Sequence, residues 1–110
     1  MTRVLMGDFS ALHRLGLKDI LRGDGVELME TAGMGVVGRL VEKLPDVVVL
    51  DLDEGATMRL VDQIVHQFPA VKVVACSSRR PRMRIFPPLH YGEFYESDLN
   101  PALLTSAVLA

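Results

Sequence analysis

The sequence predicts an α/β domain in which helices cover both faces of a parallel sheet. Two observations support this fold class. Short apolar runs rich in Val and Leu alternate along the chain with longer segments of helical period. The chain has 110 residues and is 49% hydrophobic, which is enough for one domain with a single core. The core must be aliphatic, because the chain has no Trp and few aromatic residues.

The first half of the chain predicts two strand–helix units. Strands are expected over residues 4–6 and 26–30, and helices over residues 10–21 and 35–44. Ser10 is expected to cap the first helix, and Gly23-Asp24-Gly25 to end it. The inward stripes are expected to be Leu12, Leu15, Leu17, Ile20 and Leu21 in the first helix, and Val36, Val37, Leu40, Val41 and Leu44 in the second.

The second half begins with the most strongly apolar strand, residues 47–52, after a Pro-Asp turn. A helix over residues 57–68 follows, and Pro69 ends it before a strand over residues 71–76. This helix is expected to turn Leu60, Val61, Ile64, Val65 and Phe68 inward.

Residues 77–92 contain three prolines, and proline inside a helix costs about 3 kcal/mol. We therefore expect the helix between the fourth and fifth strands to be short or irregular. Four arginines in six residues make residues 79–84 typical of a solvated loop. Phe94-Tyr95 predicts a short last strand, and Pro101 suits the first turn of a last helix.

Composition excludes several classes of function. The net charge of −2 creates no field that favours nucleic acid or an anionic membrane. The single cysteine, Cys76, excludes an internal disulfide and fits a reducing compartment. No signal peptide or run of roughly 20 apolar residues is visible, so a cytoplasmic domain is expected. The chain ends at Ala110 inside a helical pattern, so either the natural protein ends there or a longer protein was cut at a domain edge.

Asp51 is the most informative residue, because it follows the buried run Val47-Val48-Val49-Leu50. The carboxyl edge of such a strand is where open α/β sheets build their sites. Four segments, RVLMGDFSALHRLGL, LPDVVVLDL, FPAVKVVACSS and YGEFYESDLNPALL, occur in the order found in one family. Over residues 1–110 the chain resembles the CheY-like receiver domain of bacterial response regulators, most closely the NarL/FixJ type.

The resemblance implies a flavodoxin-like, five-stranded parallel sheet of order 2-1-3-4-5. It also implies a two-component signal-transduction role, in which a histidine kinase phosphorylates the domain. Asp51 would then be the phosphoacceptor, Asp8 the first residue of an acidic Mg²⁺-binding pair, and Ser77 the hydroxyl that bonds a phosphoryl oxygen. The NarL-type likeness further implies transcriptional regulation and dimerisation, with DNA contacted only through another domain.

The chain departs from this pattern at two site positions. Phe9 replaces the second acid, which removes one oxygen ligand and one charge from the Mg²⁺ site. The expected lysine near the last strand falls at about Glu96 or Ser97, and a glutamate there would repel a phosphoryl group. Because Phe9 removes a ligand, Mg²⁺ binding at Asp8 and Asp51 is expected to be weak or lost, and Asp53 is a candidate third ligand that could compensate. Arg79 or Arg80 could supply the missing cation.

The leading hypothesis is an atypical receiver domain without enzymatic activity and without a required cofactor. It would act through a protein partner or a homodimer, with phosphorylation impaired or absent. One alternative is a working phospho-receiver that accepts phosphate on Asp51. The other is a flavodoxin-like domain that binds a small ligand, although the sequence contains no phosphate-binding loop.

Overall fold

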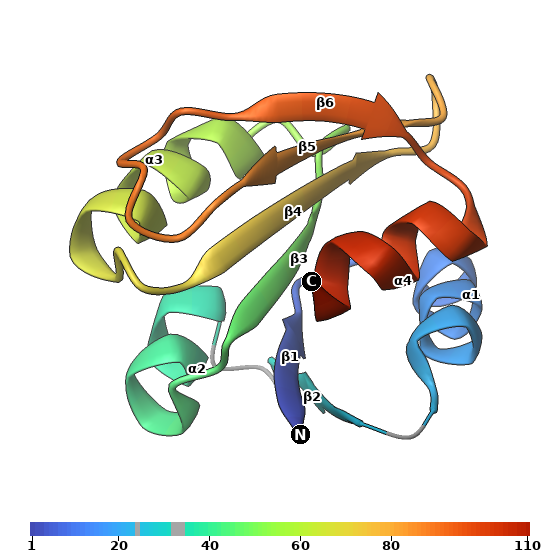
Figure 1. The fold of residues 1–110 in the computed structure, drawn as a ribbon, viewed down its shortest axis with the longest axis horizontal. Helices are drawn as coiled ribbons and strands as arrows, with labels where there is room; N and C mark the ends of the chain where they lie inside the picture. Colours follow the sequence, from blue (N-terminus) through green and yellow to red (C-terminus); the bar gives the residue numbers. More distant parts are fainter. Residues whose placement is uncertain (24, 32–34) are drawn as a thin grey trace.

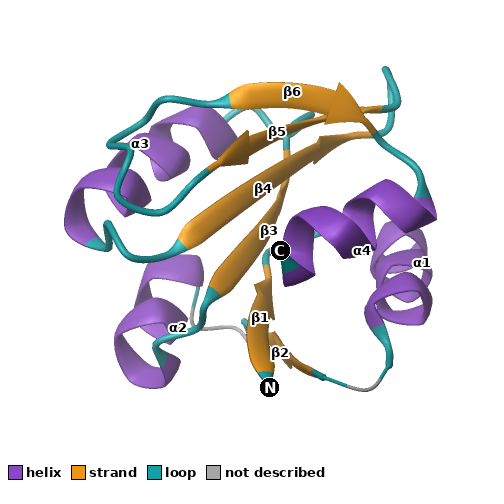
Figure 2. Cartoon of the chain, in the orientation of Figure 1, coloured by secondary structure: helices purple, strands orange, loops and turns teal. Residues whose placement is uncertain are grey.

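A six-stranded mixed sheet lies between two pairs of helices in the computed structural model, which describes residues 1–23, 25–31 and 35–110 (Figures 1 and 2). Helices α1 and α4 cover one face of the sheet, and α2 and α3 cover the other. The elements are, in chain order, β1 (Thr2–Met6), α1 (Ala11–Leu21), β2 (Val26–Glu30), α2 (Val36–Lys43), β3 (Val47–Asp51), α3 (Thr57–Gln67), β4 (Lys72–Ser77), β5 (Arg82–Phe86), β6 (Tyr95–Asp98) and α4 (Pro101–Leu109). The α/β class predicted from the sequence is confirmed.

The parallel part of the sheet has the order β2-β1-β3-β4. Its central strand, β3, is buried on both faces: Val47 and Val49 pack toward α1 and α4, whereas Val48 and Leu50 pack toward α2 and α3. A strand covered on both faces needs apolar residues at consecutive positions. This requirement explains the uninterrupted apolar run that precedes Asp51.

The prediction of five parallel strands is wrong beyond β4. A turn at residues 78–81 leads into β5, which runs antiparallel to β4, and β6 runs antiparallel to β5. Met83 and Ile85 of β5 are each only 1% exposed and alternate with Arg82 and Arg84. This period of two suits a strand with one face in the core. A β-hairpin therefore replaces the irregular helix, and half of the arginine-rich segment is strand instead of solvated loop.

The expected last strand is confirmed, but β6 lies two places from β4 instead of beside it. Charged side chains link it to β5. The guanidinium of Arg82 is 2.9 Å from the carboxylate of Asp98, and that of Arg84 is 3.6 Å from Glu96. β6 is thus held at the edge of the sheet by ion pairs as well as by its backbone pairing with β5.

Helix boundaries agree well with the sequence, but two of the predicted inward faces are partly wrong. Ser10 caps α1, yet Leu12 and Leu15 are 79% and 66% exposed. Val41 of α2 and Leu44, the residue that caps its C-terminus, are likewise exposed. The buried residues of these two helices are Leu17, Leu21, Val36 and Leu40. Asp24 of the expected Gly23-Asp24-Gly25 stop lies outside the described residues.

The predicted inward face of α3 and the predicted start of α4 are confirmed. Val61, Ile64 and Val65 of α3 are buried as expected, and Leu60 and Phe68 pack against them at the margin. Pro101 occupies the first turn of α4, where a missing N–H costs little. No helix in the described part of the chain has the length and apolarity needed to cross a membrane.

Candidate functional site

The carboxyl ends of β1, β3 and β4 meet at one edge of the sheet, as predicted. Asp51 is the last residue of β3 and pairs in register with Cys76, the residue before Ser77 at the end of β4. Gly7 follows β1 and donates its N–H to the carbonyl of Val49 at 2.9 Å. A Cβ atom at position 7 would lie 2.7 Å from the side chain of Leu50. Glycine thus lets β1 and β3 approach closely just before Asp8 and Phe9.

Asp51 organises the turn that follows β3. Its Oδ1 accepts the N–H of Asp53 at 3.0 Å, and its carbonyl accepts the hydroxyl of Thr57. Its Oδ2 accepts no hydrogen bond from any described residue, and none of the ion pairs among those residues includes Asp51. The half-buried carboxylate therefore has one oxygen available to another group.

Asp53 is bound by the β4–β5 turn and is turned toward it. Its Oδ1 accepts the hydroxyl of Ser77 at 2.7 Å. Its Oδ2 accepts the N–H and the hydroxyl of Ser78, at 2.9 and 3.1 Å, and the N–H of Arg79 at 3.3 Å. The Ser77 hydroxyl is the main reason why the pKa of Asp53 falls from 3.8 to about 2; partial burial opposes it, and the Ser78 and Arg79 donors assist. The carboxylate is thus a fixed anion near neutral pH.

The two arginines expected to supply a cation contribute backbone groups. Arg79 donates its N–H to Asp53, and Arg80 donates its N–H to Oγ of Ser77 at 3.2 Å. Neither guanidinium takes part in the ion pairs found among the described residues. The structure therefore brings both residues to the site through their main chain.

Glu96 lies away from the phosphoacceptor position. It sits on β6, opposite Arg84 of β5, with which it pairs. The strand next to β4 is β5, so the residue in register with Ser77 is Arg82. Since Arg82 pairs with Asp98, its charge is already compensated. The position expected to carry the lysine therefore lies on β6, which is separated from β4 by β5.

Asp8 and Asp51 face different cavities. Asp8 lies beside the start of α3 in a cleft of about 530 Å³ that Glu54 and Arg59 also line, and it accepts the hydroxyl of Thr31 at 2.8 Å. Asp51 lines a separate pocket. Across residues 1–23, 25–31 and 35–110, no three His, Cys, Asp or Glu side chains are grouped closely enough to hold a metal ion. Asp8, Asp51 and Asp53 are therefore not gathered into one ligand set.

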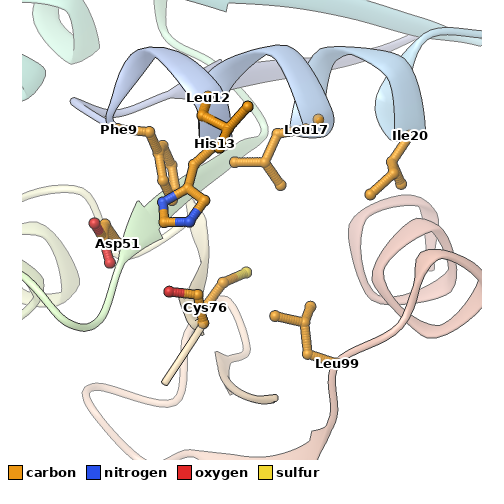
Figure 3. A pocket seen from close by; sticks show the side chains of 10 residues that line it. Phe9, Leu12, His13, Leu17, Ile20, Asp51, Cys76 and Leu99 are labelled. Carbon is orange, nitrogen blue, oxygen red and sulfur yellow. The ribbon is translucent and has the colours of Figure 1, made fainter. Parts of the chain in front are cut away.

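The pocket beside Asp51 is mainly apolar and has a volume of about 220 Å³ (Figure 3). Phe9 forms part of its wall and is only 7% exposed. Leu17 and Ile20 extend from α1 on one side, and Leu99 from the segment before α4 on the other. The remaining lining residues are Leu12, His13, Gly16, Cys76 and Ser78.

Cys76 lies on the pocket wall but is poorly suited to reaction. Burial raises the pKa of its thiol to about 12, and the nearby negative charge of Asp51 adds to this effect. Because the thiolate is the nucleophilic form, this cysteine should be inert at neutral pH. This edge of the sheet can therefore bind a group through the unpaired carboxylate oxygen of Asp51 and an apolar wall, but it offers no reactive nucleophile.

Several residues of the site were missed in the sequence analysis. Ser78 donates twice to Asp53, and the pair Ser77-Ser78 before Arg-Arg-Pro is a turn signal that could have indicated it. His13 and Leu99 line the pocket from segments far apart in the chain, and no local sequence pattern indicates them.

Comparisons of the chain with protein-family models, curated proteins and solved structures returned no match.

Proposed function

We propose that this chain is an atypical receiver-like regulatory domain that works through protein contacts, without phosphorylation of Asp51. The parallel order β2-β1-β3-β4 is compatible with the start of a flavodoxin-like sheet. Asp8, Asp51 and Ser77 follow or end β1, β3 and β4, the positions that a receiver would require. The β4–β5 hairpin is a departure that alters only the outer part of the sheet.

One observation supports the proposal that phosphate is not the signal: the carboxylate of Asp53 already accepts hydrogen bonds from the donor groups at the end of β4. In a receiver, the hydroxyl at the position of Ser77 would bond a phosphoryl group on Asp51. Here that hydroxyl is 2.7 Å from the carboxylate of Asp53, which also takes the N–H groups of Ser78 and Arg79. The carboxylate of Asp53 thus permanently accepts the hydrogen bonds that a phosphoryl group on Asp51 would need. Phosphorylation would place a second anion beside it, at an electrostatic cost.

The contact surface of this proposal is formed by β6 and α4. Tyr95 is 55% exposed and lies on the α4 side of the sheet, since it is in register with the buried Ile85. Leu103 of α4 is also partly exposed. The outer edge of β6 is not paired with any other strand that the structure describes. An exposed aromatic ring beside a free strand edge suits a second copy of the domain or a protein partner.

The phosphorylation part is tested with a small phosphodonor, acetyl phosphate, in the presence of Mg²⁺. Intact-mass analysis should detect no phosphoryl adduct, and Asp51→Asn should behave as the wild type does. Labelling of the wild type that Asp51→Asn abolishes would establish the working phospho-receiver instead.

The contact part is tested by sedimentation over a range of protein concentrations. The wild-type domain should self-associate, and Tyr95→Arg should weaken this association. Leu15→Arg is the matched control, because Leu15 is similarly exposed but lies on α1. A wild type that stays monomeric throughout would reject self-association and leave only a different partner protein for this surface.

A further inference from the structure

We propose that the pocket beside Asp51 binds a small molecule composed of an apolar body and one primary ammonium group. The proposal rests on the shape, lining and charge of this pocket. It does not depend on the regulatory role proposed above, because the same site could serve a domain of any function.

The apolar part of the ligand follows from the walls. Phe9, Leu17, Ile20 and Leu99 surround the space between α1, the end of β4 and the segment before α4 (Figure 3). Apolar cavities of roughly 150 Å³ accept a benzene molecule in other proteins. A volume of about 220 Å³ therefore has room for one ring with a short side chain.

The ammonium group follows from Asp51. Its carboxylate lies at one end of the pocket, in the part next to Phe9. Oδ1 is used by the N–H of Asp53, whereas Oδ2 accepts nothing from the described residues, and no described cation pairs with this side chain. A charge that is half buried without a counter-ion favours a cationic donor. The same charge would repel a carboxylate or phosphate ligand.

The other polar groups of the lining are compatible with this assignment. Ser78 has a hydroxyl that already donates to Asp53, and its oxygen can accept a further hydrogen bond. The imidazole of His13 extends from α1 into the pocket and can accept a hydrogen bond in its neutral form. An ammonium group has three donors, so Asp51, Ser78 and His13 provide the right kind of partners.

The first experiment is a titration of the isotopically labelled protein with phenethylammonium, followed by NMR. For so small a probe, we expect saturable shifts of pocket amides with a dissociation constant of about 1 mM. Phenethyl alcohol has the same ring and should bind about tenfold more weakly, since its hydroxyl can donate to Asp51 but carries no positive charge to pair with the carboxylate. Hydrocinnamate, which is anionic, should bind still more weakly. Absence of saturable shifts with phenethylammonium, or equal binding of the three probes, would overturn the proposal.

Two variants locate the binding. Asp51→Asn keeps an oxygen for the N–H of Asp53 but removes the charge, and should weaken phenethylammonium binding by about tenfold. Gly16→Leu places a side chain at the pocket wall. A Cβ at position 16 meets nothing within 4 Å, and leucine favours a helix, so the variant should fold and lose binding.

Matched controls come from the same helix. Asp19→Asn removes an exposed carboxylate of α1, and Leu15→Ala removes an exposed leucine; neither residue lines the pocket. Both controls should bind phenethylammonium as the wild type does. If Gly16→Leu and Asp51→Asn also retain wild-type affinity, the probe binds elsewhere and the assignment is wrong.

Discussion

The hydroxyl of Ser77 donates to the carboxylate of Asp53 at 2.7 Å, across a separation of 24 residues. This contact links the loop after β3 to the turn between β4 and β5. Together with the N–H groups of Ser78 and Arg79, it surrounds the carboxylate with donors. Asp53 therefore stabilises the start of the hairpin that distinguishes this sheet from an all-parallel one.

The first prediction concerns the stability of the domain at low pH. The folded-state pKa of Asp53 is depressed to about 2, so its contribution is present above the unfolded value and is lost as pH falls from about 4 toward 2. Asp53→Asn should lower the free energy of unfolding at pH 7 by about 1 kcal/mol, a value discounted for solvent exposure. Urea unfolding at pH 7 and near pH 2 measures this, and the difference between variant and wild type should shrink at the lower pH. A difference that does not change with pH would contradict the assignment.

The second prediction is that the turn becomes an anion site once Asp53 is removed. In Asp53→Ala the N–H groups of Ser78 and Arg79 and the hydroxyl of Ser77 lose their acceptor. Converging backbone donors of this kind bind anions. Titration with inorganic phosphate should shift the amide signals of Ser78 and Arg79 in the variant but not in the wild type. Glu54→Ala is the control from the same loop, and a response equal to that of Asp53→Ala would show that the effect is nonspecific.

The third prediction concerns Cys76. Because burial raises the pKa of its thiol to about 12, the native protein should react very slowly with a disulfide reagent at pH 8. The same thiol should react at once in denaturant. A thiol that reacts equally fast in both states would show that β4 is open at this point.

The inner sheet could be predicted because its signals are local. The apolar run of β3 ends at Asp51, and both its burial and its position at the carboxyl edge follow from that pattern. Strand β5 was missed because its arginines suggested a solvated loop. The alternation of Arg82, Met83, Arg84 and Ile85 was the better signal, since it places two apolar side chains on one face of a strand.

Other features depend on tertiary contacts that no short pattern contains. In α1, leucines occur on more than one face, so the helical period alone could not decide that Leu17 is buried and Leu12 exposed. The role of Asp53 depends on a turn formed 24 residues later. The sequence correctly selected the edge of the sheet, but it could not assign each carboxylate there to its partner.

The last prediction concerns Phe9, which stands where an acidic metal ligand would be expected and packs against the core with only 7% of its surface exposed. Phe9→Asp loses this packing, at a cost of about 3 kcal/mol, and places a second carboxylate near Asp51. Mg²⁺ would relieve the repulsion between them, so it should bind the variant and stabilise it. At about ten times its dissociation constant the ion would contribute about 1.4 kcal/mol.

Thermal unfolding of Phe9→Asp with and without Mg²⁺ measures this effect. Phe9→Asn is the matched control, because it loses the same ring and gains no charge. We expect Mg²⁺ to raise the melting temperature of Phe9→Asp alone, since neither the wild type nor Phe9→Asn brings a second carboxylate to the pocket. A Phe9→Asp variant that is folded but indifferent to millimolar Mg²⁺ would mean that the ring is not what keeps the metal out; the separate orientation of Asp8, bound to Thr31, would then be the cause.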